Sequence, residues 1–347
     1  MSSKIITKYL QEGEYAEWNK FVSNSRDGSI YSTPEYLDAL CTAAGGHFNI
    51  LATLQSDEIV GGVALYERKS LSMSYVVPRL LLYYNSFVFR NYETKYPSKA
   101  TSHRLKVMAA LEQTLSTSGY SSIRIKCHSS ISDVRFFLQS GWNAIVTYTY
   151  IVSIKDINLA WNRVEQNLRR LVNRCAQQGV QLSEDDDFDS FYELHRQTHE
   201  RKGAPLYLSR DAFHNFYKKL RSQNLCCLYH ARLPEGRSIS TQLVLTGPHA
   251  TTHTVCAGAD ENYLNLGANA FLRWKVFEDL SKSGYVANDL TDAALNPVSH
   301  FKSQLGGDLK SCLVLFRRES LPFRAVKEIN YLSARCKDLI KFILNGI

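Results

Sequence analysis

The sequence predicts an α+β protein of two similar domains, each with a mixed, mostly antiparallel sheet flanked by helices. A strand–helix–strand pattern occupies 122–154 and recurs at 285–317, and FFLQSGW at Phe136–Trp142 resembles FKSQLGG at Phe301–Gly307. Internal similarity of this kind indicates duplication. An antiparallel meander predicted before the second unit makes the sheet mixed rather than parallel. The length of 347 residues is also natural for two domains.

The first half has clear start and turn signals. Pro34 suits the first turn of a helix, because its fixed φ is helical and its missing N–H is not needed there. The turn Ser56–Asp57 between two alternating runs indicates a β-hairpin. In order, the predicted elements are strand Lys4–Leu10, helices Glu14–Val22 and Pro34–Leu40, strands Phe48–Leu54, Ile59–Arg68 and Leu80–Phe89, helix Ser98–Ser118, strand Ser122–Ile125, helix Asp133–Ser140 and strand Ala144–Ile154.

The second half repeats this plan. Its predicted elements are helices Asn158–Gln178, Phe188–Lys202 and Ser209–Ser222, meander strands Leu225–Arg232, Ile239–Leu245 and Thr251–Ala257, helix Gly267–Ser283, strand Tyr285–Leu290, helix Pro297–Leu305 and strand Leu309–Arg317. A last helix, Phe323–Leu344, has one apolar stripe and falls outside the repeat. We therefore expect domains at 1–153 and 154–318, the second carrying the site. We expect the helix within 319–347 to pack back on the first domain.

Composition limits the setting and the partners. The formal net charge of +8 fits either an ordinary basic protein or an anionic partner, such as a phosphorylated cofactor, a lipid-linked phosphate, nucleic acid or an anionic membrane surface. Eight cysteines without a CxxC pair suit a reducing compartment. The first residues contain no apolar signal-peptide core, and no apolar run is long enough to cross a bilayer. We expect a cytoplasmic protein.

A cationic stripe is predicted on the helix from Asn158. Arg163, Asn167, Arg170 and Arg174 recur at intervals of three and four, which places them on one helical face. Such a face is either solvated or bound to an anion, and the near absence of acids on this helix makes the anion as well supported as solvation. These arginines are candidate substrate-binding residues.

Further cations follow at the end of a later helix. His195 and His199 could share a metal, but no third ligand lies nearby in the sequence, so we predict no metal site. Arg201 and Lys202 are better interpreted as cations near a substrate or as partners of the helix dipole. The acidic run Glu184–Asp187 is interpreted as a solvated turn before a helix.

Two other places could hold chemistry. Gly267, Ala268 and Asn269 open a helix, and small residues there let a pyrophosphate reach backbone N–H groups. Asp289 ends a predicted strand, and Lys302 follows Phe301 directly, so that Lys302 points away from the buried face. A cation beside a strand that ends in a carboxylate is a plausible catalytic arrangement.

Motifs across the chain resemble those of the tandem GNAT-fold proteins, namely the Fem-type peptidyltransferases of peptidoglycan synthesis and the BioF2-like (CelD-type) acetyltransferase domains. The residues that carry the resemblance are Trp161, Asn167–Arg170, Arg174–Ala176 and Gly179–Val180 for "W…RR…RkA…Gv", His195–Arg201 for "h…T…R", Asp289, Phe301–Lys302 and Leu305–Gly307 for "D…FK..fGg", and Asp133, Arg135–Phe136 and Gly141–Trp142 for "D.R.f…GW".

The resemblance implies transfer of an acyl or aminoacyl group to an amine of a cell-wall, amino-sugar or polysaccharide-pathway acceptor. The donor would be acyl-CoA or an aminoacyl carrier, and the acceptor a small molecule or a lipid-linked glycan or peptide. Lys302 and Asp289 would be catalytic. Arg163, Arg170, Arg174, Arg201, Lys202 and Phe301 would bind substrate, and Gly267, Ala268 and Asn269 would bind the cofactor.

The sequence departs from the family patterns at three places. The pyrophosphate signature R/Q-x-x-G-x-G/A is only approximated at Asn262–Gly267, and Tyr84–Arg90 lacks the acid of the Fem-type first domain. The helices within 188–222 are too short for a coiled-coil arm, which disfavours tRNA as a partner; DNA is not expected. The alternative function is a non-catalytic GNAT-fold module that recognises a phosphorylated glycan, a nucleotide or a partner protein.

Overall fold

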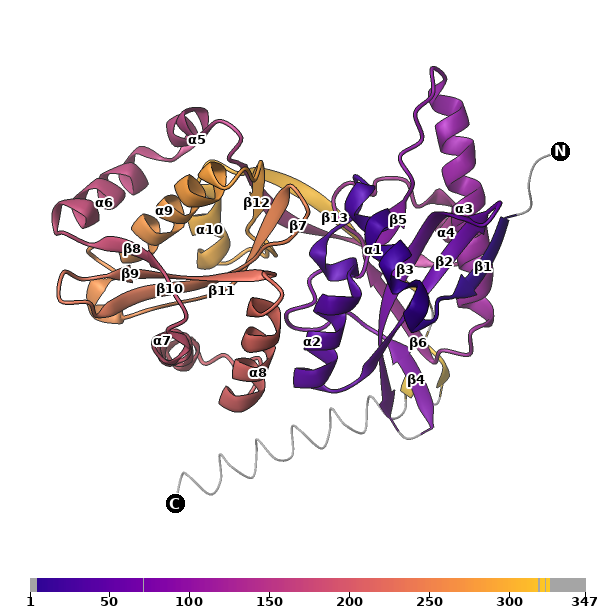
Figure 1. The fold of residues 1–347 in the computed structure, drawn as a ribbon, viewed down its shortest axis with the longest axis horizontal. Helices are drawn as coiled ribbons and strands as arrows, with labels where there is room; N and C mark the ends of the chain where they lie inside the picture. The colour runs from indigo at the N-terminus through magenta and orange to yellow at the C-terminus, as the bar shows by residue number, and fades with distance from the viewer. Residues whose placement is uncertain (1–4, 71, 318, 322, 325–347) are drawn as a thin grey trace.

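The computed structural model describes residues 5–70, 72–317, 319–321 and 323–324 (Figure 1). It confirms the α+β class with a mixed sheet. Within these ranges the strands form one 13-stranded sheet in the order β1-β2-β3-β4-β6-β13-β7-β12-β11-β10-β9-β8, with β5 paired to β3. Most pairs are antiparallel, and the parallel pairs are β4 with β6 and β11 with β12.

The first half follows the predicted order closely. Thr33 caps α2, its hydroxyl accepting from Tyr36 N, and Pro34 is the first helical residue. Its elements are β1 (Ile5–Tyr9), η1 (Glu12–Glu14), α1 (Tyr15–Asn24), η2 (Ile30–Ser32), α2 (Pro34–Ala44), β2 (His47–Gln55), β3 (Glu58–Ser70), β4 (Met73–Val76), β5 (Phe87–Phe89), α3 (Pro97–Thr117), β6 (Ser122–Lys126), α4 (Arg135–Gln139) and β7 (Asn143–Ser153).

The second half repeats the arrangement, with α6, α9 and α10 on one face of its strands and α7 and α8 on the other (Figure 1). Its elements are α5 (Ile157–Arg163), α6 (Gln166–Gln177), β8 (Gln181–Glu184), α7 (Phe188–Arg201), α8 (Arg210–Arg221), β9 (Cys226–Arg232), β10 (Ser238–Leu245), β11 (Thr251–Ala259), η3 (Glu261–Tyr263), α9 (Ala268–Lys282), β12 (Ala287–Asp289), α10 (Pro297–Ser303) and β13 (Asp308–Phe316).

Two predicted elements were wrong. The single helix Asn158–Gln178 is two helices, because Val164 turns into the core and the N–H of Glu165 donates to the carbonyl of Gln304. The predicted strand Leu80–Phe89 is a strand only at Phe87–Phe89, since Leu81 has a φ of +74° within a turn. Strands β4 and β8 were not predicted. The predicted helix Phe323–Leu344 lies almost entirely outside the described residues.

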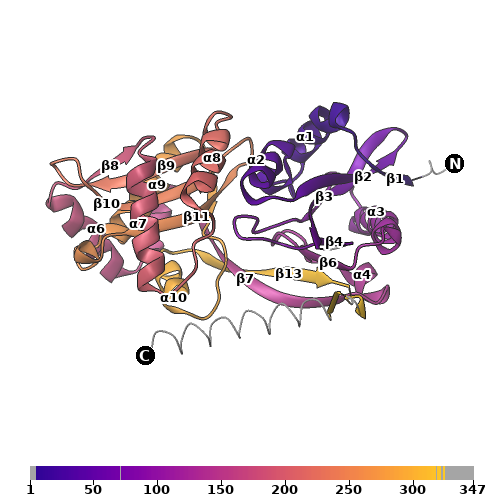
Figure 2. The same ribbon diagram turned by 90° about the horizontal axis from the view of Figure 1, so that it is seen from below.

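The last strands of the two halves are exchanged. β13 lies between β6 and β7, while β7 lies between β13 and β12, so each half's final strand pairs with the preceding strand of the other half. Figure 2 shows this long β7–β13 pair running from one half to the other. One apolar core also spans both halves and joins α2 to α8, where the Tyr36 and Phe216 rings lie 5.9 Å apart. The boundary at residue 153 stays a prediction, but it falls on a shared strand.

This exchange predicts that neither half folds alone. A fragment of residues 154–347 lacks β7, so β12 loses its antiparallel neighbour and its backbone groups lose their partners. We expect the fragment to show no cooperative thermal transition by circular dichroism, and co-expression with residues 1–153 to restore one. A fragment that melts cooperatively on its own would contradict the prediction.

Candidate active site

The site forms where two parallel strands diverge. β11 and β12 pair only from Thr251–Ala287 to His253–Asp289. β12 then ends, whereas β11 continues to Ala259. The chain after β12 turns sharply, because Thr291 and Asp292 have φ values of +49° and +50°. We call the region formed by 254–259 of β11 and 289–292 the divergence point. Residues other than glycine rarely adopt the left-handed conformation, and those that do are often found at functional sites.

Asp289 is fully buried at the divergence point. Its Oδ1 accepts hydrogen bonds from Thr149 Oγ1 at 2.5 Å and from Thr291 N at 2.8 Å, and its Oδ2 accepts from Tyr84 OH at 2.8 Å. His253 Nδ1 lies 3.5 Å from Oδ2. Burial alone would raise the pKa of Asp289, but the interactions with His253 and Thr149 outweigh it and hold the pKa well below the usual range. The carboxylate is therefore ionised and its oxygens are occupied.

The partners of Asp289 come from both halves. Tyr84 precedes β5, Thr149 lies on the exchanged strand β7, and His253 lies on β11. The Tyr84 hydroxyl also has a pKa raised by burial and by the Asp289 charge, so it remains a donor. Rings of Tyr31 and His253 pack edge-on at 4.8 Å beside it. These contacts with Tyr84, Thr149 and His253 hold the end of β12 against the first half of the chain.

Lys302 projects from α10 back to the same turn. Its ammonium donates to the carbonyl of Asp292 at 2.7 Å and also to the carbonyl of Thr291. An ammonium carries three N–H donors, so one remains available. Burial, together with the charge of Arg273, lowers the pKa of Lys302 to about 8. Lys302 is thus a partly desolvated cation held at the turn that follows the buried Asp289 carboxylate.

Further cations surround Lys302. Arg273 of α9 has a buried Nη1 without a hydrogen-bond acceptor among the described residues, and burial lowers its pKa to about 10. The pKa of Lys202 is lowered by burial and then by the charges of Arg201 and Arg273. Lys126, from β6 of the first half, also lowers the pKa of Lys302. Cations that depress one another's pKa values gain stability when an anion binds among them.

The structure separates the predicted site residues into two groups. Asp289, Lys302, Arg201 and Lys202 gather with Arg273. The arginine stripe, in contrast, does not form as predicted, because Arg163 lies on α5 and the others on α6. Arg163 pairs with Asp308 at 2.5 Å, Arg174 donates to the carbonyl of Asn265, and Arg170 is exposed. Phe301 packs against the core.

The predicted cofactor-binding residues have packing contacts instead. A Cβ on Gly267 would lie 2.7 Å from Leu171 Cβ of α6, and Gly267 has a φ of +94°. Ala268 is buried, and the Asn269 side chain accepts from Ser240 Oγ at 2.9 Å. Their contacts give no support to a pyrophosphate role, which stays a prediction.

Several site residues were missed in the sequence. Arg273, Thr149, His253 and Lys126 carry no local motif, and only the strand exchange and the α9 register bring them together. In the described ranges, no group of His, Cys, Asp and Glu is arranged to hold a metal ion. No helix among those residues is long and apolar enough to cross a membrane.

A mixed sheet whose parallel strands diverge beside a cationic cluster, with the plan present in both halves, defines the tandem GNAT-fold class. Residues 162–303 match the family model described as an acetyltransferase (GNAT) domain, so this part of the chain is an acyltransferase domain of GNAT type. The resemblance found in the sequence is thereby confirmed. A comparison with curated proteins finds no match.

Solved structures support the same fold over most of the chain. FemX aligns with a TM-score of 0.67 and 14% identity, covering 88% of this chain and 96% of that one. The C-terminal domain of a protein named as a lysylphosphatidylglycerol synthetase, from Agrobacterium fabrum, aligns with a TM-score of 0.58 and 9% identity over 88% and 92%. A tandem GNAT protein from the clavulanic acid biosynthesis pathway aligns with a TM-score of 0.51 and 8% identity over 90% and 98%.

Proposed function

We propose that this acyltransferase moves an acyl or aminoacyl group from an anionic donor, either acyl-CoA or an aminoacyl carrier, to an amine of a cell-wall, amino-sugar or polysaccharide-pathway acceptor. The observation that supports it is the cationic cluster of Lys202, Arg273 and Lys302 at the divergence point. Both donors carry phosphates, and guanidinium groups bind phosphate oxygens in a bidentate manner. The name of the lysylphosphatidylglycerol synthetase agrees with an aminoacyl group, and the tandem GNAT protein, whose name mentions AcCoA, agrees with acyl-CoA.

The reaction needs a developing negative charge to be stabilised. The acceptor nitrogen attacks the donor carbonyl carbon, a C–N bond forms, and the carbonyl oxygen becomes an oxyanion. Collapse of this intermediate breaks the bond to the donor's sulfur or oxygen, and the ammonium proton leaves to solvent or to the leaving group. The third N–H of Lys302 can donate to the oxyanion, since the other two are held by the carbonyls of Thr291 and Asp292.

Asp289 has a different role from Lys302. Its oxygens already accept three hydrogen bonds, and its low pKa makes it a poor proton acceptor. It fixes the turn at Thr291 and thereby the two carbonyls that hold Lys302. We therefore assign Asp289 as a positioning residue and Lys302 as the catalytic cation.

Donor binding is expected to depend on Arg273. Arg273→Gln should weaken binding of the phosphate-bearing donor by about 10- to 100-fold, because a hydrogen bond to a charged group contributes about 1.5–3 kcal/mol. Lys275→Gln on the same helix is the matched control, since Lys275 already pairs with Glu278 at 2.7 Å. Isothermal titration with acyl-CoA and aminoacyl-tRNA measures both. Equal effects of the two substitutions would contradict this assignment.

Transfer itself is tested with the same donors. Purified protein is incubated with a labelled acyl-CoA panel or labelled aminoacyl-tRNAs and with amine acceptors, namely amino sugars and peptidoglycan precursors. We expect label transfer that Lys302→Ala abolishes. If donors bind but no label moves to any acceptor, the non-catalytic binding module becomes the better interpretation.

A further inference from the structure

The repeat points to a second place where the chain could bind a ligand. Gly119 and Gly284 end equivalent helices, Gly141 and Gly306 follow the next ones, and the residue spacing is the same in both pairs. All four have positive φ values. If the same offset is applied to α3, residues 102–104 are equivalent to residues 267–269 at the start of α9. In the second half this position is filled by Leu171.

In the first half the equivalent position opens into a cavity. The cavity has a volume of about 460 Å³ and lies between α3, the segment after β5, and the loops at 26–27 and 130–133. A neighbouring cavity of about 350 Å³ shares Tyr92 and His103 with it and adds Lys99 and Lys106. The start of α3 is thus accessible where the start of α9 is covered.

The Arg104 side chain lines this cavity and is fixed by two contacts. Its Nη2 donates to Asp27 Oδ2 at 3.2 Å, and its guanidinium lies over the Phe89 ring at 4.8 Å from the centroid. Asp27 is only 4% exposed, so the Arg104 guanidinium is paired with a buried carboxylate. Among the described residues, no other acceptor takes the remaining N–H groups of Arg104. A guanidinium that is paired on one edge can still donate two parallel hydrogen bonds from its other N–H groups to a phosphate or carboxylate.

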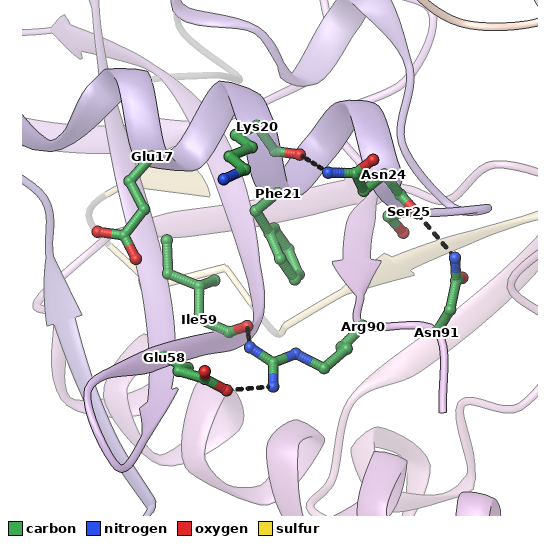
Figure 3. A pocket seen from close by; sticks show the side chains of 9 residues that line it. All are labelled: Glu17, Lys20, Phe21, Asn24, Ser25, Glu58, Ile59, Arg90 and Asn91. Carbon is green, nitrogen blue, oxygen red and sulfur yellow. Dashed lines mark hydrogen bonds and ion pairs between the residues drawn. The ribbon is translucent and has the colours of Figure 1, made fainter. Parts of the chain in front are cut away.

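Most of the other charged groups around the cavity are already paired. Asp133 is neutralised by Arg135, which reaches both of its oxygens at 2.9 and 2.8 Å. Arg90 is also occupied: Figure 3 shows its guanidinium turned to Glu58 and to the carbonyl of Ile59, in the cavity on the α1 side. Arg26 has no carboxylate partner within the described ranges. Glu93 is exposed and is the remaining lining carboxylate.

An aromatic surface lies beside these cations. Tyr92 stacks on His103 with ring centroids 5.0 Å apart and planes 20° apart, and Tyr92 is 46% exposed. The Nε2 of His103 is buried and has no hydrogen-bond partner among the described residues. We propose that this cavity binds a nucleotide, with its phosphates on Arg104 and Arg26 and its base on the Tyr92–His103 pair. The site is separate from the donor site at Lys302.

The test uses the full chain carrying Lys302→Ala and Arg273→Gln, so that the donor site is weakened. Binding of ADP, UDP and inorganic pyrophosphate is measured by isothermal titration. Arg26→Ala should weaken all three at least tenfold, and Tyr92→Ala should weaken only ADP and UDP. Lys20→Ala, in the neighbouring cavity of Figure 3, should change nothing. Arg104→Lys, which keeps the charge beside Asp27, should weaken binding without unfolding the chain.

Two results would overturn the proposal. One is the absence of binding of any probe to the wild-type chain at millimolar concentration. The other is binding that disappears with the donor-site substitutions and is insensitive to Arg26→Ala, which would place the phosphates at Lys302. If donor transfer fails but Arg26-dependent nucleotide binding persists, the proposed function falls and this site stands.

Discussion

Asp289→Ala is expected to lower the free energy of unfolding by about 3–5 kcal/mol, the usual cost of removing one partner from a buried charged network. The substitution leaves the hydroxyls of Tyr84 and Thr149 and the N–H of Thr291 buried without an acceptor. Urea denaturation of both proteins measures the difference. Asp292→Asn is the matched control, because Asp292 is exposed and Asn tolerates its left-handed backbone. A loss below about 1 kcal/mol for Asp289→Ala would contradict the network.

The effect of Asp289 should also depend on pH. Its pKa is lowered in the folded state, so its contribution to stability is full above its unfolded pKa of about 4 and is lost as the pH falls through the folded value. The stability difference between wild type and Asp289→Asn should therefore shrink below about pH 4. A difference that is constant from pH 7 to pH 3 would mean that the carboxylate is not ionised in the fold.

The sequence predicted the local elements better than their pairing. Helical and alternating hydrophobic patterns, together with the glycines and prolines that bound them, located α3, α9 and β13 to within one residue at each end. The exchange of β7 and β13 has no such local signal, since either strand could pair with its own half. It is decided by long-range contacts that a repeat pattern cannot distinguish.

The candidate site was predicted in part for the same reason. Asp289 and Lys302 belong to one strand–helix unit, so their spacing places them together. The predicted arginine stripe on the helix from Asn158 was wrong because the prediction assumed one continuous helix through Val164. Val164 is buried, and the helix ends there. Arg273 was missed because an arginine within an apolar helix has no distinctive neighbours in the sequence. Tyr84 and Thr149 reach Asp289 only through the exchanged sheet.

Lys302→Ala is expected to reduce kcat by about 10²- to 10³-fold, the usual effect of removing one oxyanion donor. Lys310→Ala is the control, since Lys310 is exposed beside Asp308 at the start of β13 and should keep full activity. Steady-state rates with the best donor and acceptor pair measure both. Equal loss in the two variants would remove Lys302 from the mechanism.

The pH dependence decides whether Lys302 acts as a cation or as a base. Its pKa of about 8 means that the ammonium predominates at pH 7 and is lost as the pH rises through 8. If the charge stabilises the oxyanion, kcat/KM of the wild type should fall above pH 8, and Lys302→Arg, which stays protonated, should lack that fall. If neutral Lys302 instead accepts the proton of the acceptor ammonium, kcat/KM should rise through pH 8 and Lys302→Arg should be inactive. The two carbonyl contacts of the ammonium favour the first outcome, because a carbonyl accepts hydrogen bonds from the charged form more strongly than from the neutral amine.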